Sequence, residues 1–446
     1  MNVLFLLVDC LKADITWGTD RRVKTPTLDA LREQGTFATQ VISVAGSTPV
    51  CLASLFTGVY PFVHGIRPLS LNRFHLSTTK LNPNCPTLAE ILRQSGYATC
   101  ATTTGPILHV TDLDRGFDQY THRATDDVYL HQHFSRDLRR LVQSLDDTGK
   151  PWLLFAHLWE LHAPRQVLPE FNSSRYGSNR YERAVSSFDH QLAAILQSVD
   201  FTNTLVIIHG DHGEGTGSLL EFMLHPFLYE KMGIEAMRLF YGLCFRWIHR
   251  YRVLQSAHGL NLYDEMVRVP LILAGPGVPK GCVIREQVSQ IDILPTLLDL
   301  AGAPPGLWPP MQGRSLLPLI KGNPWVERPV YSEAYSGRSI SLRHLPIRRA
   351  KAGTFPKPPA LAAIRTSEWK CIWVPEDPRI PTELYHLTED PLEKENLFSR
   401  RRDVAEELKS HLARLESGWQ PGAQQATMSP EEQAILEDRL RELGYL

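Results

Sequence analysis

The sequence predicts an α/β fold: a large, mostly parallel sheet sandwiched by helices, followed by a small C-terminal antiparallel sheet and a helix. Two apolar runs, 2–8 and 204–208, are continuous rather than alternating, as in strands that are buried on both faces. Strand-like and helix-like segments alternate along the chain, which is the order of βαβ units. With 446 residues, 43% of them hydrophobic, the chain is long enough for a sizeable core.

Capping and stop residues place the elements that follow the first strand. Residues 25–35 predict a short helix, because Thr25 suits a helix cap and Gly35 a helix end. The remaining elements of the main domain are expected, in order, as a helix at 86–96, strands at 97–101, 151–157 and 270–275, and a helix at 289–302.

Proline-rich connections after residue 303 mark the transition to a second unit. The short strand-like segments 363–366 and 370–374 predict a four-stranded antiparallel sheet with a C-terminal helix. We therefore expect a catalytic α/β domain at 1–320, with a helical lid insertion at 218–256, and a C-terminal α+β subdomain at 321–446.

Composition restricts the partners and the compartment. The net charge of -1 provides no overall attraction to polyanions, so nucleic acid is not expected as a partner. The first apolar stretch is too short for a membrane span and lacks the features of a signal peptide. Seven cysteines occur without CxxC pairs, which is typical of reduced thiols. These features predict a cytoplasmic protein.

Residues 237–252 interrupt the strand and helix pattern by mixing aromatic residues with arginines. One interpretation is a surface helix that covers the active site. The alternative is an interfacial helix that contacts a lipid surface or a long substrate, because basic and aromatic residues together suit a membrane surface.

Both apolar runs end in acidic residues. Asp9 follows the first run, and Asp211 and His212 follow the run at 204–208. Because ligands bind at the carboxyl edge of such sheets, these side chains are expected to converge there and hold a divalent cation. The glycines Gly210 and Gly213 are expected to relieve crowding around the ion. Asp14 suits the first turn of a helix as well as a metal site.

Residues 46–58 begin with hydroxyl side chains and continue as a helix that ends at Gly58. Ser47 is either the cap of this helix or a nucleophile, and the segment alone does not decide between them. A hydroxyl at this position faces free backbone amides, which also suits an incoming phosphate or sulfate. Arg67 and Arg165 are candidate contacts for that anion. His157 and Glu160 lie near His162 in the sequence, and His157 equally suits a hydrogen bond inside the core.

Together these motifs resemble the sulfatase family of the alkaline phosphatase superfamily. The resemblance is carried by Asp9, by Ser47–Gly58, by the Leu161-His-Ala-Pro segment, by Gly210–Glu214, by His258 with 262–270, and by 292–296, 312–316 and 383–396. It implies an alkaline phosphatase-like fold, catalysis by Ser47, His162 and His258, and one divalent ion (Mn, Ca, Mg or Zn). The ion would be held by Asp9, Ser47, Asp211 and His212.

The chain departs from that family at its most characteristic motif. Where the family has Cys-x-Pro-Ser-Arg, with a cysteine that becomes formylglycine, this chain has Ser47 and, at the arginine position, Cys51. Cys10 replaces the second aspartate of the family's Asp-Asp pair. The resemblance therefore implies a metal-dependent hydrolase or transferase of phosphate or sulfate esters, including phosphodiesters, that forms a covalent Ser47 intermediate.

Two alternatives to this function stay open. One is a formylglycine-type sulfuric ester hydrolase, similar to an arylsulfatase, with an oxidised Ser47. The other is a catalytically silent binding protein on the same fold. The expected substrate is a small-molecule or lipid-like anionic ester, and the sequence does not define the oligomeric state.

Overall fold

A computed structural model describes most of the chain. The described residues are 1–16, 21–68, 70–72, 75–105, 107, 109–123, 127–163, 165–215, 259, 261–335, 361–375, 382–422, 424–425, 428–431, 433–434 and 437–438. The expected insertion at 218–256 and the segment 237–252 lie outside them. None of the helices in these ranges combines the length and the apolar character needed to cross a bilayer.

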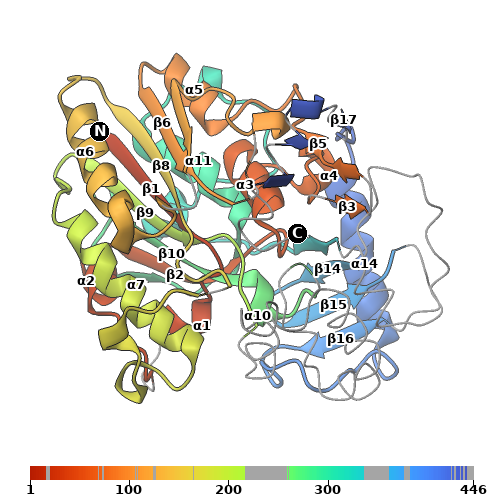
Figure 1. Ribbon diagram of the computed structural model, residues 1–446. Helices are drawn as coiled ribbons and strands as arrows, with labels where there is room; N and C mark the ends of the chain where they lie inside the picture. Colours follow the sequence, from red (N-terminus) through yellow and green to blue (C-terminus); the bar gives the residue numbers. More distant parts are fainter. Residues whose placement is uncertain are drawn as a thin grey trace.

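The core element is a nine-stranded sheet with the order β11-β2-β10-β9-β1-β8-β6-β7, in which β12 also pairs with β2 (Figure 1). Its pairings are parallel except those of β10, which runs antiparallel to β9 and β2. This arrangement confirms the predicted mostly parallel sheet. The strands are β1 (Asn2–Val8), β2 (Thr36–Ile42), β6 (Ala98–Thr103), β7 (Gln119–His122), β8 (Trp152–Leu158), β9 (Thr204–Gly210), β10 (Arg268–Ala274), β11 (Cys282–Ile284) and β12 (Val288–Ser289).

Helices cover both faces of this sheet (Figure 1). The central strands carry apolar side chains on both faces, and the helices bury them. In β1, Phe5 packs in the core cluster that contains α3 and α11, whereas its neighbour Leu6 packs in the cluster that contains α2 and α7. The sandwich predicted from the sequence is therefore confirmed. The longer helices are α2 (Pro26–Gln34), α3 (Thr48–Thr57), α5 (Leu88–Gln94), α6 (Ser135–Asp146), α7 (Arg180–Leu196) and α11 (Ile293–Ala301).

Short elements complete the main domain. Its single-turn helices are α1 (Ala13–Thr16), α4 (Pro61–His64), α10 (Asp264–Val267) and α12 (Leu317–Ile320). Two small ladders join β3 (Ser70–Asn72) to β4 (His75–Ser77), and β5 (Thr79–Lys80) to β17 (Gln424–Gln425).

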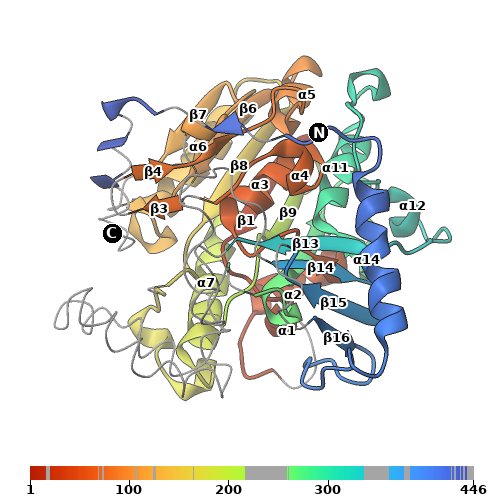
Figure 2. The ribbon, with the colours of Figure 1, turned by 90° about the vertical axis from the view of Figure 1, so that its right-hand side faces the viewer.

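The C-terminal region forms a separate four-stranded antiparallel sheet with α14 (Arg402–Glu416) packed against it, as predicted (Figure 2). Its strands are β13 (Val330–Ala334), β14 (Leu361–Arg365), β15 (Trp369–Trp373) and β16 (Glu383–His386). A buried ion cluster joins this sheet to the main domain: Asp264 of α10 lies 2.8 Å from Arg365 and 2.9 Å from Lys370.

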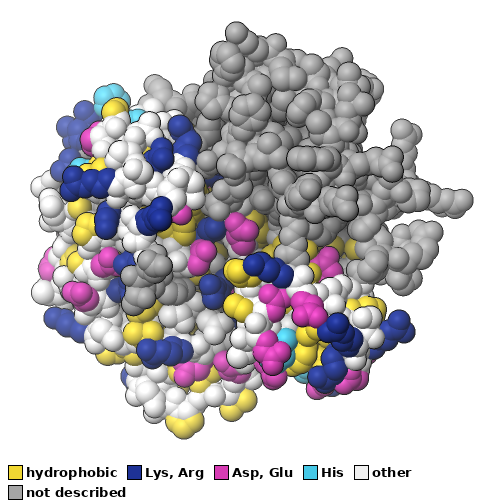
Figure 3. Space-filling model, turned by 90° about the horizontal axis from the view of Figure 1, so that it is seen from below, with side chains coloured by type: hydrophobic (Ala, Val, Ile, Leu, Met, Phe, Trp, Pro, Cys, Tyr) yellow, Lys and Arg dark blue, Asp and Glu magenta, His cyan; other side chains and the backbone are white. Residues whose placement is uncertain are grey.

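The surface agrees with the near-neutral composition. On the face shown in Figure 3, basic and acidic side chains are interspersed over the described part of the molecule.

Candidate active site

The sheet brings Asp9 and Asp211 together from distant parts of the chain. Strands β1 and β9 pair in parallel with Val8 opposite Gly210, so the next residue of each strand leaves the sheet at the same edge. The backbone amide of Cys10 donates to Oδ1 of Asp211 over 3.0 Å. Both carboxylates are fully buried.

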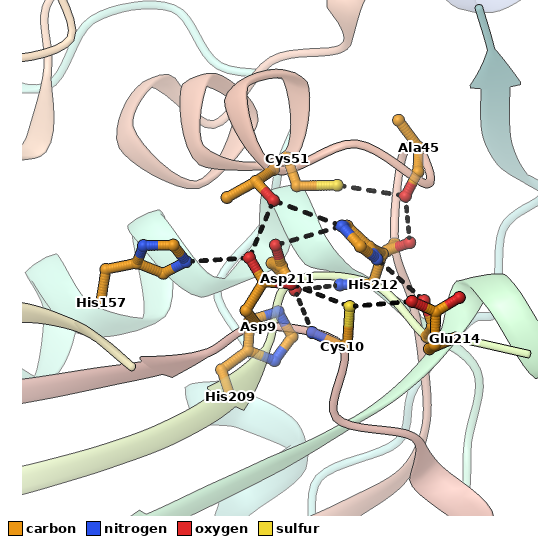
Figure 4. Close-up of polar contacts among 12 residues, drawn as sticks. Asp9, Cys10, Ala45, Cys51, His157, His209, Asp211, His212 and Glu214 are labelled. Atoms are coloured by element: carbon orange, nitrogen blue, oxygen red, sulfur yellow. Dashed lines mark hydrogen bonds and ion pairs between the residues drawn. The ribbon is translucent and has the colours of Figure 1, made fainter. Parts of the chain in front are cut away.

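Helix α3 brings a hydroxyl to this pair. Oγ1 of Thr48 lies 3.1 Å from Oδ2 of Asp9 and 3.3 Å from Nε2 of His212. The side chains of Asp9, Asp211 and His212 lie together in Figure 4. Thr48 is the first residue of α3, and its side chain is buried. Ser47 precedes it as the N-cap, is half-buried, and makes no capping hydrogen bond. The hydroxyl that contacts the acidic cluster is therefore that of Thr48, adjacent to the predicted nucleophile.

His157, on β8, is a direct neighbour of Asp9. Its Nε2 lies 3.2 Å from Oδ2 of Asp9, and its Nδ1 lies 3.2 Å from the carbonyl oxygen of Thr104. Because a carbonyl only accepts, Nδ1 donates its proton to Thr104, and this bond orients the ring so that Nε2 faces Asp9. His212 has the same arrangement, with Nδ1 2.8 Å from the carbonyl oxygen of Gly213. Metal-binding histidines are commonly oriented by such a backbone contact.

The charges of the cluster favour a cation. Burial acts to raise the pKa of Asp9, but its hydrogen bond with His157 and the nearby His162 and His212 lower it overall. Burial and the charge of Asp9 raise the pKa of Asp211. Oδ2 of Asp211 is buried and has no hydrogen-bond partner among the described residues, while it lies 3.4 Å from Nε2 of His212.

The residues present therefore fit a divalent ion. Two groups of candidate ligand atoms each lie within 4.8 Å of one another: Asp9, Cys10 and His212, and Asp9, His157 and Asp211. Carboxylate oxygens and imidazole nitrogens are typical ligands of divalent metals. An uncompensated buried carboxylate pair is costly, and a bound cation removes that cost.

Backbone geometry at the two strand ends is unusual. Cys10 has a φ of 61°, a left-handed conformation that costs a non-glycine residue roughly 1–3 kcal/mol and is concentrated at functional sites. A Cβ on Gly210 would lie 2.4 Å from the carbonyl oxygen of Leu11, and one on Gly213 would lie 2.0 Å from that of Glu265. These glycines therefore allow close backbone packing beside the site, rather than space around an ion as expected from the sequence.

The structure also describes three other predicted site residues, His162, Arg165 and Arg67. His162 is buried, stacks on Trp159 with 3.9 Å between ring centroids, and has its Nδ1 2.7 Å from the carbonyl oxygen of Ala163. Arg165 is buried 3.8 Å from Glu214, a neighbour of Cys10. Arg67 lies 3.7 Å from the buried Glu333 of β13.

Asp14 and His258 are the two remaining residues that the sequence analysis considered for the site. Asp14 is exposed in the first turn of α1 and belongs to neither group of candidate ligands. His258 lies outside the described residues. The next residue, Gly259, packs against Gly46, where a Cβ would lie 2.9 Å from the Gly259 nitrogen.

Three residues of the cluster were not among the predicted catalytic or metal-binding residues: His157, Thr48 and Cys10. His157 carried a usable signal, since it is the single polar side chain in the apolar run 152–158. Thr48 and Cys10 directly follow predicted site residues, and their orientation depends on local backbone geometry that residue order does not reveal.

Comparison with known proteins identifies the class. Residues 1–303 match the sulfatase family, and residues 260–351 match the C-terminal region of N-sulphoglucosamine sulphohydrolase. The chain belongs to the sulfatase family. It is thus an enzyme of the ester hydrolase class, which argues against a catalytically silent binding protein.

Individual relatives agree with this assignment. The chain is 25% identical to an ulvan-active sulfatase of Formosa agariphila, over 90% of this chain and 77% of the relative. It is 34% identical to a choline-sulfatase of Rhizobium meliloti, but over only 32% of this chain and 24% of the relative. The phosphonate monoester hydrolase of Agrobacterium radiobacter has the same fold, with a TM-score of 0.65 at 17% identity, covering 93% of this chain and 95% of that chain.

Proposed function

We propose that this chain is a metal-dependent hydrolase or transferase of phosphate or sulfate esters that forms a covalent intermediate on Ser47. The observation that carries the proposal is the position of the α3 N-terminus, where the Thr48 hydroxyl touches both Asp9 and His212. That contact holds the start of the helix against the acidic cluster, and the half-buried Ser47 is the residue directly before Thr48. Its substrate would be a small-molecule or lipid-like anionic ester.

Asp9, Asp211 and His212 would hold the divalent ion, and His157 is suitably oriented to join them. When bound, such an ion lowers the pKa of a coordinated hydroxyl and neutralises charge on the ester. In the first turn of α3, the backbone amides of Thr48 and Val50 would stabilise negative charge that develops on the transferred group, whereas Pro49 has no N–H to contribute.

His162 is proposed as the proton donor to the leaving oxygen. Its contact with the Ala163 carbonyl occupies the Nδ1 proton and fixes the ring against Trp159, so the proton for the leaving oxygen would come from Nε2 of the protonated ring. A second donor is proposed at His258, which the sequence assigns by resemblance. Arg165 and Arg67 are proposed to bind the anionic group of the substrate, and both carry a charge that favours it. Peripheral membrane contact through 237–252 and a cytoplasmic location stay predictions.

A substrate panel tests this function. Aryl sulfate, phosphomonoester, phosphodiester and phosphonate substrates should be compared with the metal-loaded wild type, Ser47→Ala and Thr48→Val. Ser47→Ala is expected to abolish turnover on the preferred ester, and Thr48→Val to reduce it. Full activity of Ser47→Ala combined with loss in Thr48→Val would assign the nucleophile to Thr48 and contradict the proposal.

The second candidate is a formylglycine-type sulfatase, which the sulfatase names of the relatives favour. It requires oxidation of Ser47 to the aldehyde. Mass spectrometry of the peptide that contains Ser47 separates the two candidates, because an unmodified serine in active protein excludes the second.

A further inference from the structure

Cys10 lies inside the candidate metal cluster and not merely next to it. Its Sγ lies 2.9 Å from Oδ1 of Asp9 and 3.7 Å from Oε2 of Glu214. Sulfur, a carboxylate oxygen of Asp9 and a ring nitrogen of His212 form one of the two groups whose atoms lie within 4.8 Å of one another. The side chain is fully buried.

The backbone of Cys10 supports a role for its side chain. Its φ of 61° is one that residues with a Cβ rarely adopt, and it coincides with the hydrogen bond from the Cys10 amide to Asp211. A cysteine held in this conformation at the end of a central strand lies where both carboxylates converge. Strain of this kind is concentrated at functional sites.

We propose that the Cys10 thiolate is a ligand of the bound metal, so that the site selects a zinc-like ion over Mg²⁺ or Ca²⁺. The donor set of sulfur, imidazole nitrogen and carboxylate oxygen is typical of Zn²⁺, whereas Mg²⁺ and Ca²⁺ favour oxygen donors alone. On metal binding the Cys10 S–H bond breaks, the proton leaves to solvent, and a metal–sulfur bond forms. This inference refines the metal-dependent function proposed above and rests on its metal site.

Cobalt substitution tests the ligand directly. Metal-free wild type, Cys10→Ser and Cys371→Ser should each be titrated with Co²⁺ and followed by absorbance. Cys371 is an equally buried cysteine in β15, outside both groups of candidate ligands, so Cys371→Ser is the matched control. A thiolate-to-cobalt charge-transfer band in the near ultraviolet is expected in the wild type and the control, and is expected to be lost in Cys10→Ser.

Selectivity supplies a second measurement. Removing a residue that only hydrogen-bonds to a metal ligand lowers metal affinity by about 10- to 100-fold. Cys10→Asp replaces the proposed sulfur ligand with oxygen, so it is expected to lower the ratio of Zn²⁺ affinity to Mg²⁺ affinity at least about tenfold. If the Cys10 variants fail to fold, X-ray absorption at the zinc edge of the wild type is decisive, because a sulfur ligand contributes at about 2.3 Å.

The proposal would be overturned if the charge-transfer band survived in Cys10→Ser, or if the wild type bound cobalt without showing this band. It would also be overturned if the X-ray absorption spectrum of the zinc-bound wild type showed only nitrogen and oxygen neighbours. These readouts do not depend on turnover. A cobalt–thiolate band in a protein that cleaves no ester of the panel would therefore contradict the proposed function while leaving the Cys10 ligand established.

Discussion

Nε2 of His157, on β8, lies 3.2 Å from Oδ2 of Asp9, which directly follows the neighbouring parallel strand β1, although the two residues are separated by almost 150 positions. Both side chains are fully buried, so solvent does not weaken this contact. The pair links β8 to the acidic cluster and makes His157 part of the site rather than of the apolar core.

Replacing His157 tests that link. His157→Gln is expected to lower the affinity for the divalent ion by about 10- to 100-fold, because it removes an imidazole that orients or binds beside Asp9. Metal affinity by calorimetry is the measurement. His64→Gln is the matched control, since His64 is equally buried but bonds to Ser54 and lies outside both groups of candidate ligands. Equal losses in the two variants would contradict the assignment.

Asp211→Asn should separate metal binding from folding. The raised pKa of Asp211 means that folding disfavours its charged form, so its contribution to stability falls as the pH rises above its ordinary value of 3.8. At pH 7 without metal, the neutral amide is therefore expected to increase the free energy of unfolding. Added metal should raise the melting temperature of the wild type but not of the variant. A metal-dependent rise in both would show that Asp211 does not hold the ion.

Glu333 predicts a pH dependence of stability. Burial is the main cause that raises its pKa to about 7 from 4.5, and the nearby Arg67 opposes the shift. The folded protein therefore binds this proton more tightly than the unfolded chain, and stability is lost as the pH rises from 4.5 through 7. Glu333→Gln removes this loss, which is up to about 3 kcal/mol. Urea unfolding at pH 5 and pH 8 measures it, with the exposed Glu406→Gln as control. Parallel pH profiles for wild type and Glu333→Gln would refute it.

Gly213→Ala tests the close packing at the end of β9. The added methyl would lie 2.0 Å from the Glu265 carbonyl oxygen, so the backbone must move. We expect a loss of about 1–3 kcal/mol in the free energy of unfolding, together with weaker metal binding through the displaced His212. Gly306→Ala is the matched control, because nothing lies within 4 Å of its new Cβ. Similar stabilities of the two variants would show that the strand end tolerates the methyl group.

Much of the fold was predictable because the signals are local. The apolar runs at β1 and β9 predicted buried parallel strands, and Thr25 with Gly35 predicted α2 within one residue at each end. The antiparallel direction of β10 was not predictable, since direction depends on how a connection crosses the sheet and not on the strand's own residues. The site was predictable as far as Asp9, Asp211 and His212, which follow strand ends.

The sequence by itself determined that two core strands end in carboxylates, that a hydroxyl pair begins a helix, and that the chain resembles sulfatases. Only the tertiary structure decided that Thr48 rather than Ser47 contacts Asp9, that His157 joins the cluster, and that the Cys10 sulfur lies against Asp9. The physical reason is the range of the interactions involved. Strand ends and helix starts follow from neighbouring residues, whereas convergence of side chains depends on strand order, register and the backbone angle of a single residue.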